Sequence, residues 1–278
     1  MNVLEFTLLI GCSSVAAGFL GSLTGLGGGM VIVPLLTLVF HVDIHYAVGA
    51  SLVSVIATSS GAAAGYVRDG YTNVRIGMLL EIATTLGALV GASVASLLPG
   101  SLISVLFGVA LLSSAVAARR EPDAGPSTTP PDLWAMKLRL NGTLPTPDGP
   151  KAYRVRWIPL GFALSTVAGL AAGLLGIGAG ALKVLVMDQV MRMPFKVSTA
   201  TSNFMIGVTA AAGVGVYLDQ GFIDPGLAMP VMLGVTLGSW LGGRVLAGAD
   251  TRWLRLVFSA VVLLIGVEMI RDGLTGRW

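Results

Sequence analysis

Ten apolar segments make up most of the chain, and no other feature of the sequence constrains its fold as strongly. Eight of them approach the length of about 20 residues that an α-helix needs to cross a bilayer. These are 3–23, 45–66, 75–98, 101–118, 157–175, 197–217, 226–248 and 253–270. The other two, 29–41 and 180–191, are shorter, and each follows a glycine-rich break. The sequence therefore predicts an all-α polytopic membrane protein.

Charged residues are too scarce for a soluble protein of this size. The chain of 278 residues has 17 Lys+Arg and 14 Asp+Glu, so that 11% of it is charged, against about 25% in soluble domains. The net charge of +3 comes without a dense basic patch, and we expect no nucleic-acid partner. The single cysteine, Cys12, excludes a disulfide framework. Because the sequence contains no catalytic or metal-binding motif, we expect no enzyme activity, no cofactor and no metal.

A hydrophilic stretch at 119–156 divides the chain into a first membrane repeat, 1–118, and a second, 157–278. This stretch is rich in proline and holds seven of the 17 basic residues, so we interpret it as a cytoplasmic linker. Within it, 137–140 and 153–157 alternate between apolar and polar residues around a middle rich in glycine and proline. The alternation is compatible with a small β-hairpin.

The two halves match each other without gaps at an offset of 151 residues, over roughly 80 residues. The matched pairs include Gly18 with Gly169, Gly25 with Gly176, Gly29 with Gly180, Ser51 with Ser202, Thr58 with Thr209 and Gly87 with Gly238. The short segments and the breaks before them recur at the same offset. Paired repeats with short, glycine-interrupted segments are typical of secondary transporters.

The two short segments decide how the repeats are related. If they re-enter the membrane, each half crosses four times and the repeats are parallel. If they cross as parts of broken helices, each half crosses five times and the repeats are inverted. Inversion places 14 of the 17 basic residues in the cytoplasm, two outside and Lys183 in the membrane, whereas the parallel arrangement places 11 inside and five outside. Because cytoplasmic loops carry the excess of Lys and Arg, we favour inverted repeats with extracytoplasmic termini.

The two glycine-rich breaks are the first candidate part of a binding site. Consecutive glycines interrupt a helix, and a break at membrane depth is tolerated only where protein or a cavity covers the backbone. The free N–H groups of the next half-helix then favour an anion, the alternative being close helix packing through small residues. The candidate residues are Gly25, Gly27, Gly28 and Gly29 in the first break and Gly176, Gly178 and Gly180 in the second.

Polar residues near the breaks complete the candidate site. Ser202 and Asn203 follow the second short segment, and Ser51 is the counterpart of Ser202 in the first half. Their donors suit the oxygens of an anion, although a serine also bonds its own helix backbone. Lys183 follows the second break, and a lysine inside a membrane is a functional hypothesis by default, with snorkelling to the interface as the alternative. Glu81, inside the 75–98 segment, is a candidate for carrying a proton, the alternative being an ion pair near the interface, for example with Arg75.

Three motifs carry a resemblance to a known family. They are Gly25-Leu26-Gly27-Gly28-Gly29, His45-Tyr46-Ala47-Val48-Gly49-Ala50-Ser51 and Lys196-Val197-Ser198-Thr199-Ala200-Thr201-Ser202-Asn203-Phe204. Through them and the two-half layout, nearly the whole chain resembles the sulfite exporter TauE/SafE family of bacterial membrane transporters. The resemblance implies movement, often outward, of sulfite, sulfoacetate or other organosulfonates. The chain departs from the family pattern at Ala50, where a threonine is expected, and at Ala179, where the second break has no glycine.

The resulting hypothesis is a secondary transporter that exports small sulfur-containing anions across the bacterial cytoplasmic membrane by alternating access. Expelling one negative charge from a cell with a negative interior gains about 2.3 kcal/mol per 100 mV, so that export needs no coupling ion. The alternatives are an uptake permease for sulfate, thiosulfate or another anion, and a non-transporting membrane partner of sulfur metabolism. The expected partners are the anion and the lipid bilayer, and the sequence is silent on the oligomeric state.

Overall fold

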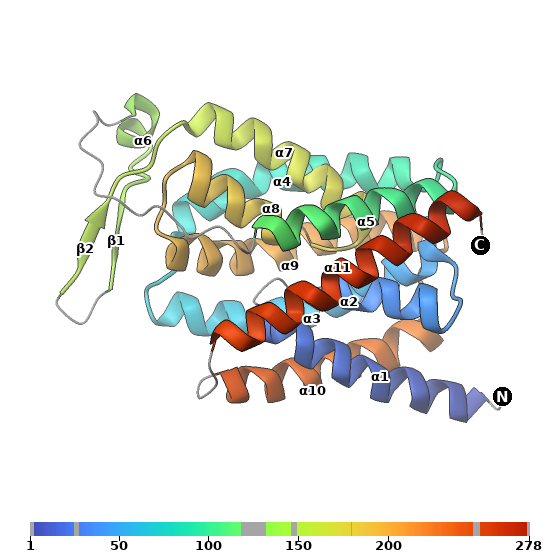
Figure 1. Ribbon diagram of the computed structural model, residues 1–278. Helices are drawn as coiled ribbons and strands as arrows, with labels where there is room; N and C mark the ends of the chain where they lie inside the picture. Colours follow the sequence, from blue (N-terminus) through green and yellow to red (C-terminus); the bar gives the residue numbers. More distant parts are fainter. Residues whose placement is uncertain are drawn as a thin grey trace.

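The helices expected from the apolar segments are all present in the computed structural model, which describes residues 3–24, 28–117, 132–145, 149–178, 180–246 and 251–276 (Figure 1). The first half contains α1 (Val3–Thr24), α2 (Gly29–Pro34), η1 (Leu35–Val39), α3 (Ile44–Arg68), α4 (Val74–Ala95) and α5 (Gly100–Ala117). The second half contains α7 (Ile158–Leu175), α8 (Gly180–Leu185), η2 (Val186–Val190), α9 (Phe195–Asp219), α10 (Pro225–Leu246) and α11 (Thr251–Thr275). Each short segment is thus an α-helix that continues into a π-helical turn, η1 or η2.

The offset of 151 residues between the halves reappears in the backbone. Helices α3 and α9 begin and end 151 residues apart, and so do α4 and α10. The π-helical turns η1 and η2 keep the same offset. In the loop after each turn, His41 and its counterpart Arg192 have positive φ angles of 52° and 57°. The two halves therefore share their local structure as well as their sequence pattern.

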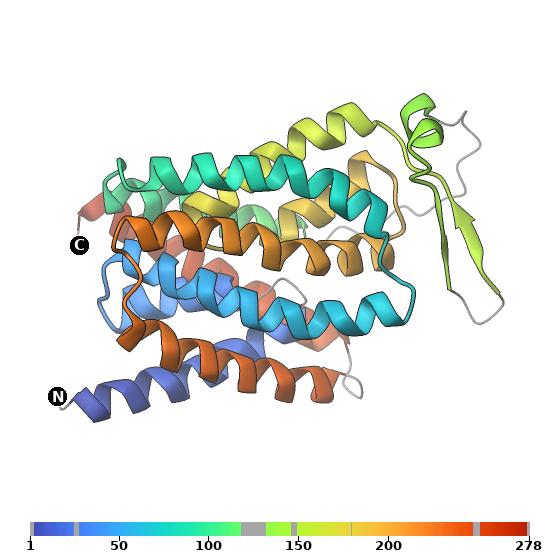
Figure 2. The same cartoon turned by 180° about the vertical axis from the view of Figure 1, so that it is seen from behind.

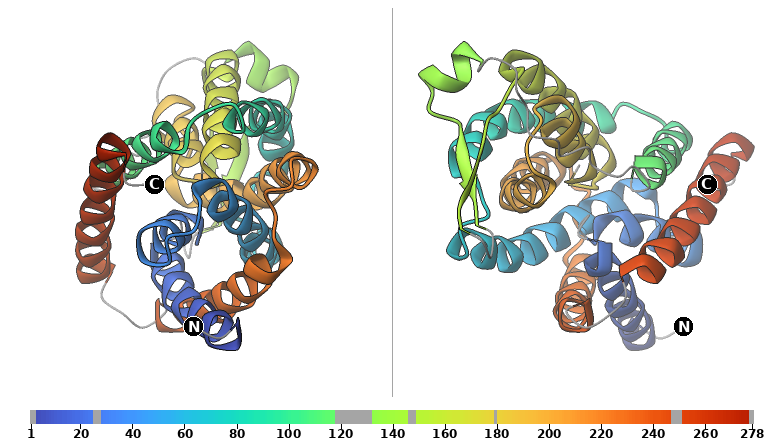
Figure 3. Two further views of the ribbon diagram at one scale, coloured as in Figure 1. Left: turned by 90° about the vertical axis from the view of Figure 1, so that its right-hand side faces the viewer. Right: turned by 60° about the vertical axis from the view of Figure 1, so that its left-hand side comes forward.

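The helices of one half pack mainly against those of the other. Helix α1 packs along α10, α7 along α4, α3 along α9, and α5 along α11, so that α11 lies on one flank of the bundle beside α5 (Figure 3). Glycines permit the close approach: a Cβ at Gly87 would lie 2.1 Å from the carbonyl oxygen of Thr166, and one at Gly238 would lie 2.0 Å from that of Val15. For these two equivalent glycines, close helix packing is the physical reason for the repeat.

The two chain ends lie at the same end of the bundle, and the linker hairpin lies at the opposite end (Figures 1 and 2). Helix α1 runs from the end that holds the termini towards the hairpin end, whereas α7 starts beside the hairpin and runs back (Figure 1). Counterpart helices α3 and α9 also run in opposite directions (Figure 2).

Among the residues whose side chains are described, three helices, α4, α7 and α9, are long and apolar enough to cross a membrane. Shorter apolar stretches occur at Glu5–Leu20, Gly29–Val39, Ile44–Ser60, Gly100–Ser113 and Pro225–Leu241, in the part of the chain whose side chains are described. Many large apolar side chains point outward, among them Leu86 on α4, Val167 on α7 and Val208 on α9. Such a surface fits a lipid environment.

The described part of the linker contains α6 (Leu133–Lys137) and a two-stranded antiparallel sheet, β1 (Gly142–Leu144) and β2 (Lys151–Tyr153). A small hairpin is therefore present in the linker, but its strands are shifted from the alternating segments 137–140 and 153–157, and only Tyr153 belongs to both. Asp132 accepts a hydrogen bond from the backbone N–H of Trp134 and caps α6, so that 133–137 folds as a helical turn. The paired residues lie closer to the turn than the apolar alternation indicates.

The linker is docked on the bundle through Asn73, in the loop between α3 and α4. The Nδ2 of Asn73 donates to the carbonyl oxygen of Leu140 at 2.9 Å and to the hydroxyl of Tyr153 at 2.8 Å. Burial raises the pKa of Tyr153, while the hydrogen bond from Asn73 lowers it to a lesser extent. The backbone N–H of Asn73 donates to Oγ1 of Thr201 on α9 at 3.0 Å. One loop residue thus joins the linker to the helix that carries the Ser202 motif.

Candidate anion-binding site

The second glycine break is a left-handed turn between α7 and α8. Gly176 and Gly178 have φ angles of +68° and +64°, a conformation that L side chains rarely adopt. In the first break, Gly25 and Gly27 lie outside the described residues. Gly28 and Gly29 are buried, and the carbonyl oxygen of Gly28 accepts hydrogen bonds from the backbone N–H groups of the first turn of α2. The described glycines of both breaks are therefore buried in the protein.

Ser51 and Ser202 tie the glycine breaks to their surroundings. The hydroxyl of Ser51 donates to the carbonyl oxygen of Gly176 at 2.9 Å, and that of Ser202 donates to the carbonyl oxygen of Gly180 at 3.1 Å. A Cβ at Gly29 would lie 2.8 Å from Oγ of Ser51 and 2.9 Å from the same Gly176 oxygen. The two breaks thus meet at Ser51. Because a serine hydroxyl has one proton, and each of these two donates it to a backbone carbonyl, neither has a donor left for a ligand.

Asn203, next to Ser202 on α9, is 9% exposed. Its side-chain amide forms no hydrogen bond with another residue in the described ranges. A buried amide with free donors is a costly group in an apolar environment. The amide of Asn203 is therefore unpaired within the described ranges, whereas the two serines donate to backbone carbonyls.

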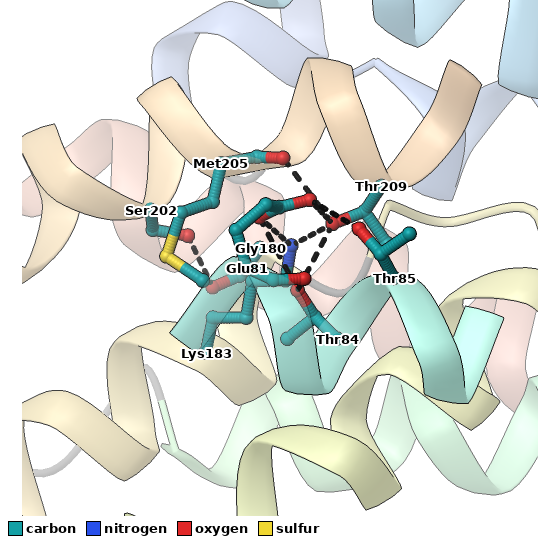
Figure 4. Close-up of polar contacts among 8 residues, drawn as sticks. All are labelled: Glu81, Thr84, Thr85, Gly180, Lys183, Ser202, Met205 and Thr209. Atoms are coloured by element: carbon teal, nitrogen blue, oxygen red, sulfur yellow. Dashed lines mark hydrogen bonds and ion pairs between the residues drawn. The ribbon is translucent and has the colours of Figure 1, made fainter. Parts of the chain in front are cut away.

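Lys183 lies one turn into α8 and is 1% exposed, so it does not snorkel to an interface. Its Nζ donates a hydrogen bond to Oγ1 of Thr209 on α9. It also lies 3.8 Å from Oε2 of Glu81 on α4 (Figure 4). The two ionisable residues that the sequence places in separate segments are therefore one buried ion pair between α4, α8 and α9.

Threonine hydroxyls surround the carboxylate of Glu81. Thr209 donates to Oε1 at 2.7 Å, and Thr85 donates to the same oxygen at 3.1 Å. Thr84 donates to Oε2 at 3.2 Å. Figure 4 shows the three hydroxyls and the Lys183 ammonium converging on this carboxylate. Together they form a compact set of donors, the kind of environment that an oxyanion requires.

The helical periodicity explains how the cluster assembles. Glu81, Thr84 and Thr85 stand at positions i, i+3 and i+4 of α4 and share one face. Ser202 and Thr209 share a face of α9, seven residues apart, so that α9 carries the glycine-break contact and the cluster on the same side. The three threonines were missed by sequence reasoning, although Thr209 was visible as the repeat counterpart of Thr58.

The equivalent place in the pseudo-symmetric half is mostly apolar. Lys183 corresponds to Ile32, Glu81 to Met232 and Thr84 to Val235, at the offset of 151 residues. The two remaining counterparts are threonines, Thr58 for Thr209 and Thr236 for Thr85. Each donates to the backbone of its own helix, Thr58 to the carbonyl oxygens of Ser54 and Val55 and Thr236 to that of Met232. The repeat therefore supplies a common scaffold, and only the half-site at α8 carries charge.

Other candidate groups offer less. His45 contacts Oδ1 of Asp43 at 2.9 Å and the carbonyl oxygen of Ala95 at 3.2 Å, and it stacks on Phe222. It fastens loops at the end of the bundle that holds the termini. Among the described residues, no three His, Cys, Asp or Glu side chains lie close enough to hold a metal ion.

Comparison with known proteins identifies related sequences along nearly the whole chain. The family model described as "Sulfite exporter TauE/SafE" matches residues 10–269. The probable membrane transporter protein YunE of Bacillus subtilis is 28% identical over 278 residues, covering 98% of this chain and 99% of the relative. The probable membrane transporter protein MJ0441 of Methanocaldococcus jannaschii is 22% identical, covering 96% and 97%. No solved structure matches the chain.

Proposed function

The chain belongs to the sulfite exporter TauE/SafE family, and on that basis we propose that it exports small sulfur-containing anions such as sulfite, sulfoacetate or other organosulfonates. Its relatives are named as probable membrane transporters, and the protein is a membrane transporter rather than an enzyme. The substrate, the outward direction and alternating access in the cytoplasmic membrane are parts of the proposal.

The observation that carries the proposal is the buried donor set between the two halves. Lys183 comes from the second half and Glu81 from the first, and Thr209 bridges them. A charged group buried within a membrane protein is expensive and marks substrate or ion pathways. A sulfonate or sulfite group offers three oxygens, which match an ammonium and several hydroxyl donors.

The glycine breaks form the second part of the proposed site. Gly25, Gly27, Gly28 and Gly29 stand at one break and Gly176, Gly178 and Gly180 at the other, and in the proposal their helix ends favour the anion. Asn203 supplies a free amide beside them. Ser51 and Ser202 hold the carbonyls of Gly176 and Gly180, so their role is to position the breaks.

We further propose that the halves are inverted repeats whose relative rocking alternates access. The opposite directions of α1 and α7, the shared location of the two termini and the position of the hairpin at the other end support this arrangement (Figure 1). The proposal places the linker in the cytoplasm and both termini outside. Reporter fusions test it: a fusion at the C-terminus is expected to report an extracytoplasmic location, and a cytoplasmic report contradicts inversion.

The proposed function is tested by reconstituting the purified protein in liposomes and following labelled sulfite, sulfoacetate, taurine and sulfate. Saturable movement of sulfite or a sulfonate supports the transporter. Preference for sulfate points to the sulfate permease instead, and movement of none of the four anions removes the transport proposal in favour of a non-transporting role. The direction is tested in cells, where deletion is expected to raise the internal concentration of the exported anion.

A further inference from the structure

We propose that the carboxylate of Glu81 occupies the place of the substrate's anionic group in the empty transporter, and that a monoanion binds there when Glu81 takes up a proton. One anion and one proton then cross the membrane together, with no net charge. This inference rests on the proposed transport function and specifies its substrate charge and its coupling.

The environment of Glu81 is that of a bound oxyanion. Its two oxygens accept hydrogen bonds from Thr84, Thr85 and Thr209, at 2.7 to 3.2 Å, and face the Lys183 ammonium at 3.8 Å. These are the donors that a sulfonate needs. Because each hydroxyl has one proton to donate, the carboxylate and a substrate anion compete for the same hydrogen bonds.

Charge balance connects this competition to a proton. With Glu81 ionised, the pair with Lys183 is neutral, and the ion pair is 1% and 11% exposed at its two side chains. Adding a substrate anion to this state would leave a net negative charge in a buried site. The anion would also lie beside the ionised carboxylate of Glu81, and both effects are strongly unfavourable. If Glu81 instead binds a proton from water, its carboxyl becomes neutral, and Lys183 pairs with the substrate. Both the empty and the loaded site are then neutral.

Among the described residues of the helices packed around Glu81, Lys183 is the charged group that faces its carboxylate. The other ionisable groups on these helices lie at helix ends or have other partners. Helix α7, which packs along α4, contains no ionisable residue. On α9, Lys196 and Asp219 stand at the two ends, and the hydroxyl of Tyr217 donates to the carbonyl oxygen of Leu174. On α4, Arg75 is in the first turn and donates to the carbonyl oxygen of Arg139 in the linker. In η2, Asp188 accepts from Gln189.

Two consequences follow from the neutral exchange. Monoanions such as simple alkanesulfonates or hydrogensulfite are favoured over dianions, because a dianion would leave one charge unbalanced at the site. Of the candidate anions above, sulfate and sulfoacetate are dianions near neutral pH, and the inference disfavours both. The membrane potential does no work on the loaded carrier. The direction of net flux is then set by the product of the anion and proton activities on the two sides, and the potential-driven export expected for a free anion does not apply. Where the cell interior is more alkaline than the outside, the proton gradient opposes export, so the outward gradient of the anion must exceed it.

The experiment uses proteoliposomes and methanesulfonate, a permanent monoanion whose own charge does not change with pH. For the wild-type protein, an external pH one unit below the internal pH is expected to drive about tenfold accumulation. An inside-positive potential of about 60 mV, set with valinomycin and potassium, is expected to drive none, although it would concentrate a freely carried monoanion tenfold. Potential-driven accumulation by the wild-type protein without a response to the pH gradient overturns the inference.

The variant Glu81→Gln mimics the protonated carboxyl and releases Lys183. Its methanesulfonate flux is expected to respond to the potential and to lose its response to the pH gradient. The matched control is Glu268→Gln, since Glu268 pairs with Arg271 on α11, away from the cluster, and this variant is expected to behave as the wild type. A Glu81→Gln protein that still couples flux to the pH gradient removes Glu81 from the role.

The failure of this inference is distinct from the failure of the transport proposal. Methanesulfonate flux that is driven by potential leaves the transporter intact and refutes the coupling. Absence of flux for every anion tested refutes transport and the coupling with it. If Glu81→Gln does not fold, the coupling is tested instead by measuring how many protons the wild-type protein takes up in detergent when it binds methanesulfonate. One proton per bound methanesulfonate, seen in a weakly buffered solution, is the expected value, and binding without proton uptake contradicts it.

Discussion

The hydroxyl of Ser51 donates a hydrogen bond to the carbonyl oxygen of Gly176 at 2.9 Å, across 125 positions in the chain and between the two halves. This bond holds the left-handed turn of the second glycine break against α3 of the first half. It also fixes the place where Gly29 approaches Gly176. A serine that the sequence places in a binding site is therefore part of the structure that supports the site.

Ser51→Ala is expected to destabilise the folded protein by about 1 to 3 kcal/mol, because the buried Gly176 carbonyl loses its donor. The measurement is thermal unfolding in detergent. Ser93→Ala is the control, since Ser93 is exposed and donates to Leu89 in its own helix. Equal melting temperatures for Ser51→Ala and the wild type contradict the structural role.

Removing one partner of the buried Lys183–Glu81 pair is expected to destabilise the folded protein more than removing both partners. Lys183→Met leaves the Glu81 carboxylate without its cation, and loss of one partner of a buried pair costs about 3 to 5 kcal/mol. The double variant Lys183→Met with Glu81→Gln removes both charges, and it is expected to recover most of the lost stability. Thermal unfolding of the four proteins measures the coupling, and additive losses would show that the two side chains do not interact.

Thr209→Val and Thr58→Val form a matched pair, because the two threonines occupy equivalent positions of α9 and α3. Thr209 bridges Lys183 and Glu81, and a hydrogen bond to a charged group contributes about 1.5 to 3 kcal/mol. Thr209→Val is therefore expected to weaken methanesulfonate binding at least about tenfold. Thr58 bonds only its own helix in the described structure, so Thr58→Val is expected to bind normally. Equal affinities for both variants would place the anion elsewhere.

Gly29→Ala tests the contact between the breaks. The added Cβ would lie 2.8 Å from Oγ of Ser51 and 2.9 Å from the Gly176 oxygen, closer than real Cβ contacts allow. We expect a lower melting temperature and a smaller monodisperse fraction in size-exclusion chromatography. At Gly215, by contrast, nothing lies within 4 Å of an added Cβ, and Gly215→Ala within α9 is expected to stabilise by about 0.5 to 1 kcal/mol. A Gly29→Ala protein as stable as the wild type would contradict the close approach.

Asn73→Ala is expected to undock the linker. Its side chain donates to Leu140 and Tyr153, and the loss of both bonds, at about 1 kcal/mol each, corresponds to roughly a thirtyfold rise in the undocked population. Limited trypsin digestion, with mass spectrometry to identify cuts after Arg139 and Lys151, measures it. Tyr153→Phe removes only one of the two bonds and is expected to give a smaller increase. Unchanged cleavage in Asn73→Ala would show that the linker is held by its apolar contacts alone.

Much of the fold could be predicted because its determinants are local. The lengths of the apolar segments and the glycines between them place the helices, and the offset of 151 residues carries over to α3, α9, α4 and α10 at both ends. The first linker strand was misplaced because 137–140 close the helical turn of α6: the backbone N–H groups of Leu138 and Leu140 donate to the carbonyl oxygens of Trp134 and Ala135 and not to a partner strand.

The sequence by itself determined which residues are unusual: a lysine and a glutamate in apolar segments, and glycine runs that no continuous helix tolerates. Only the tertiary structure decided how they are combined. Lys183 and Glu81 are 102 positions apart in the chain, and whether two buried charges are neighbours depends on how α4, α8 and α9 pack. That packing is set by side chains and glycines throughout the bundle, so no local pattern reports it. In the folded protein Lys183 is one partner of an ion pair, and Ser51 and Ser202 donate hydrogen bonds to the backbone of the breaks.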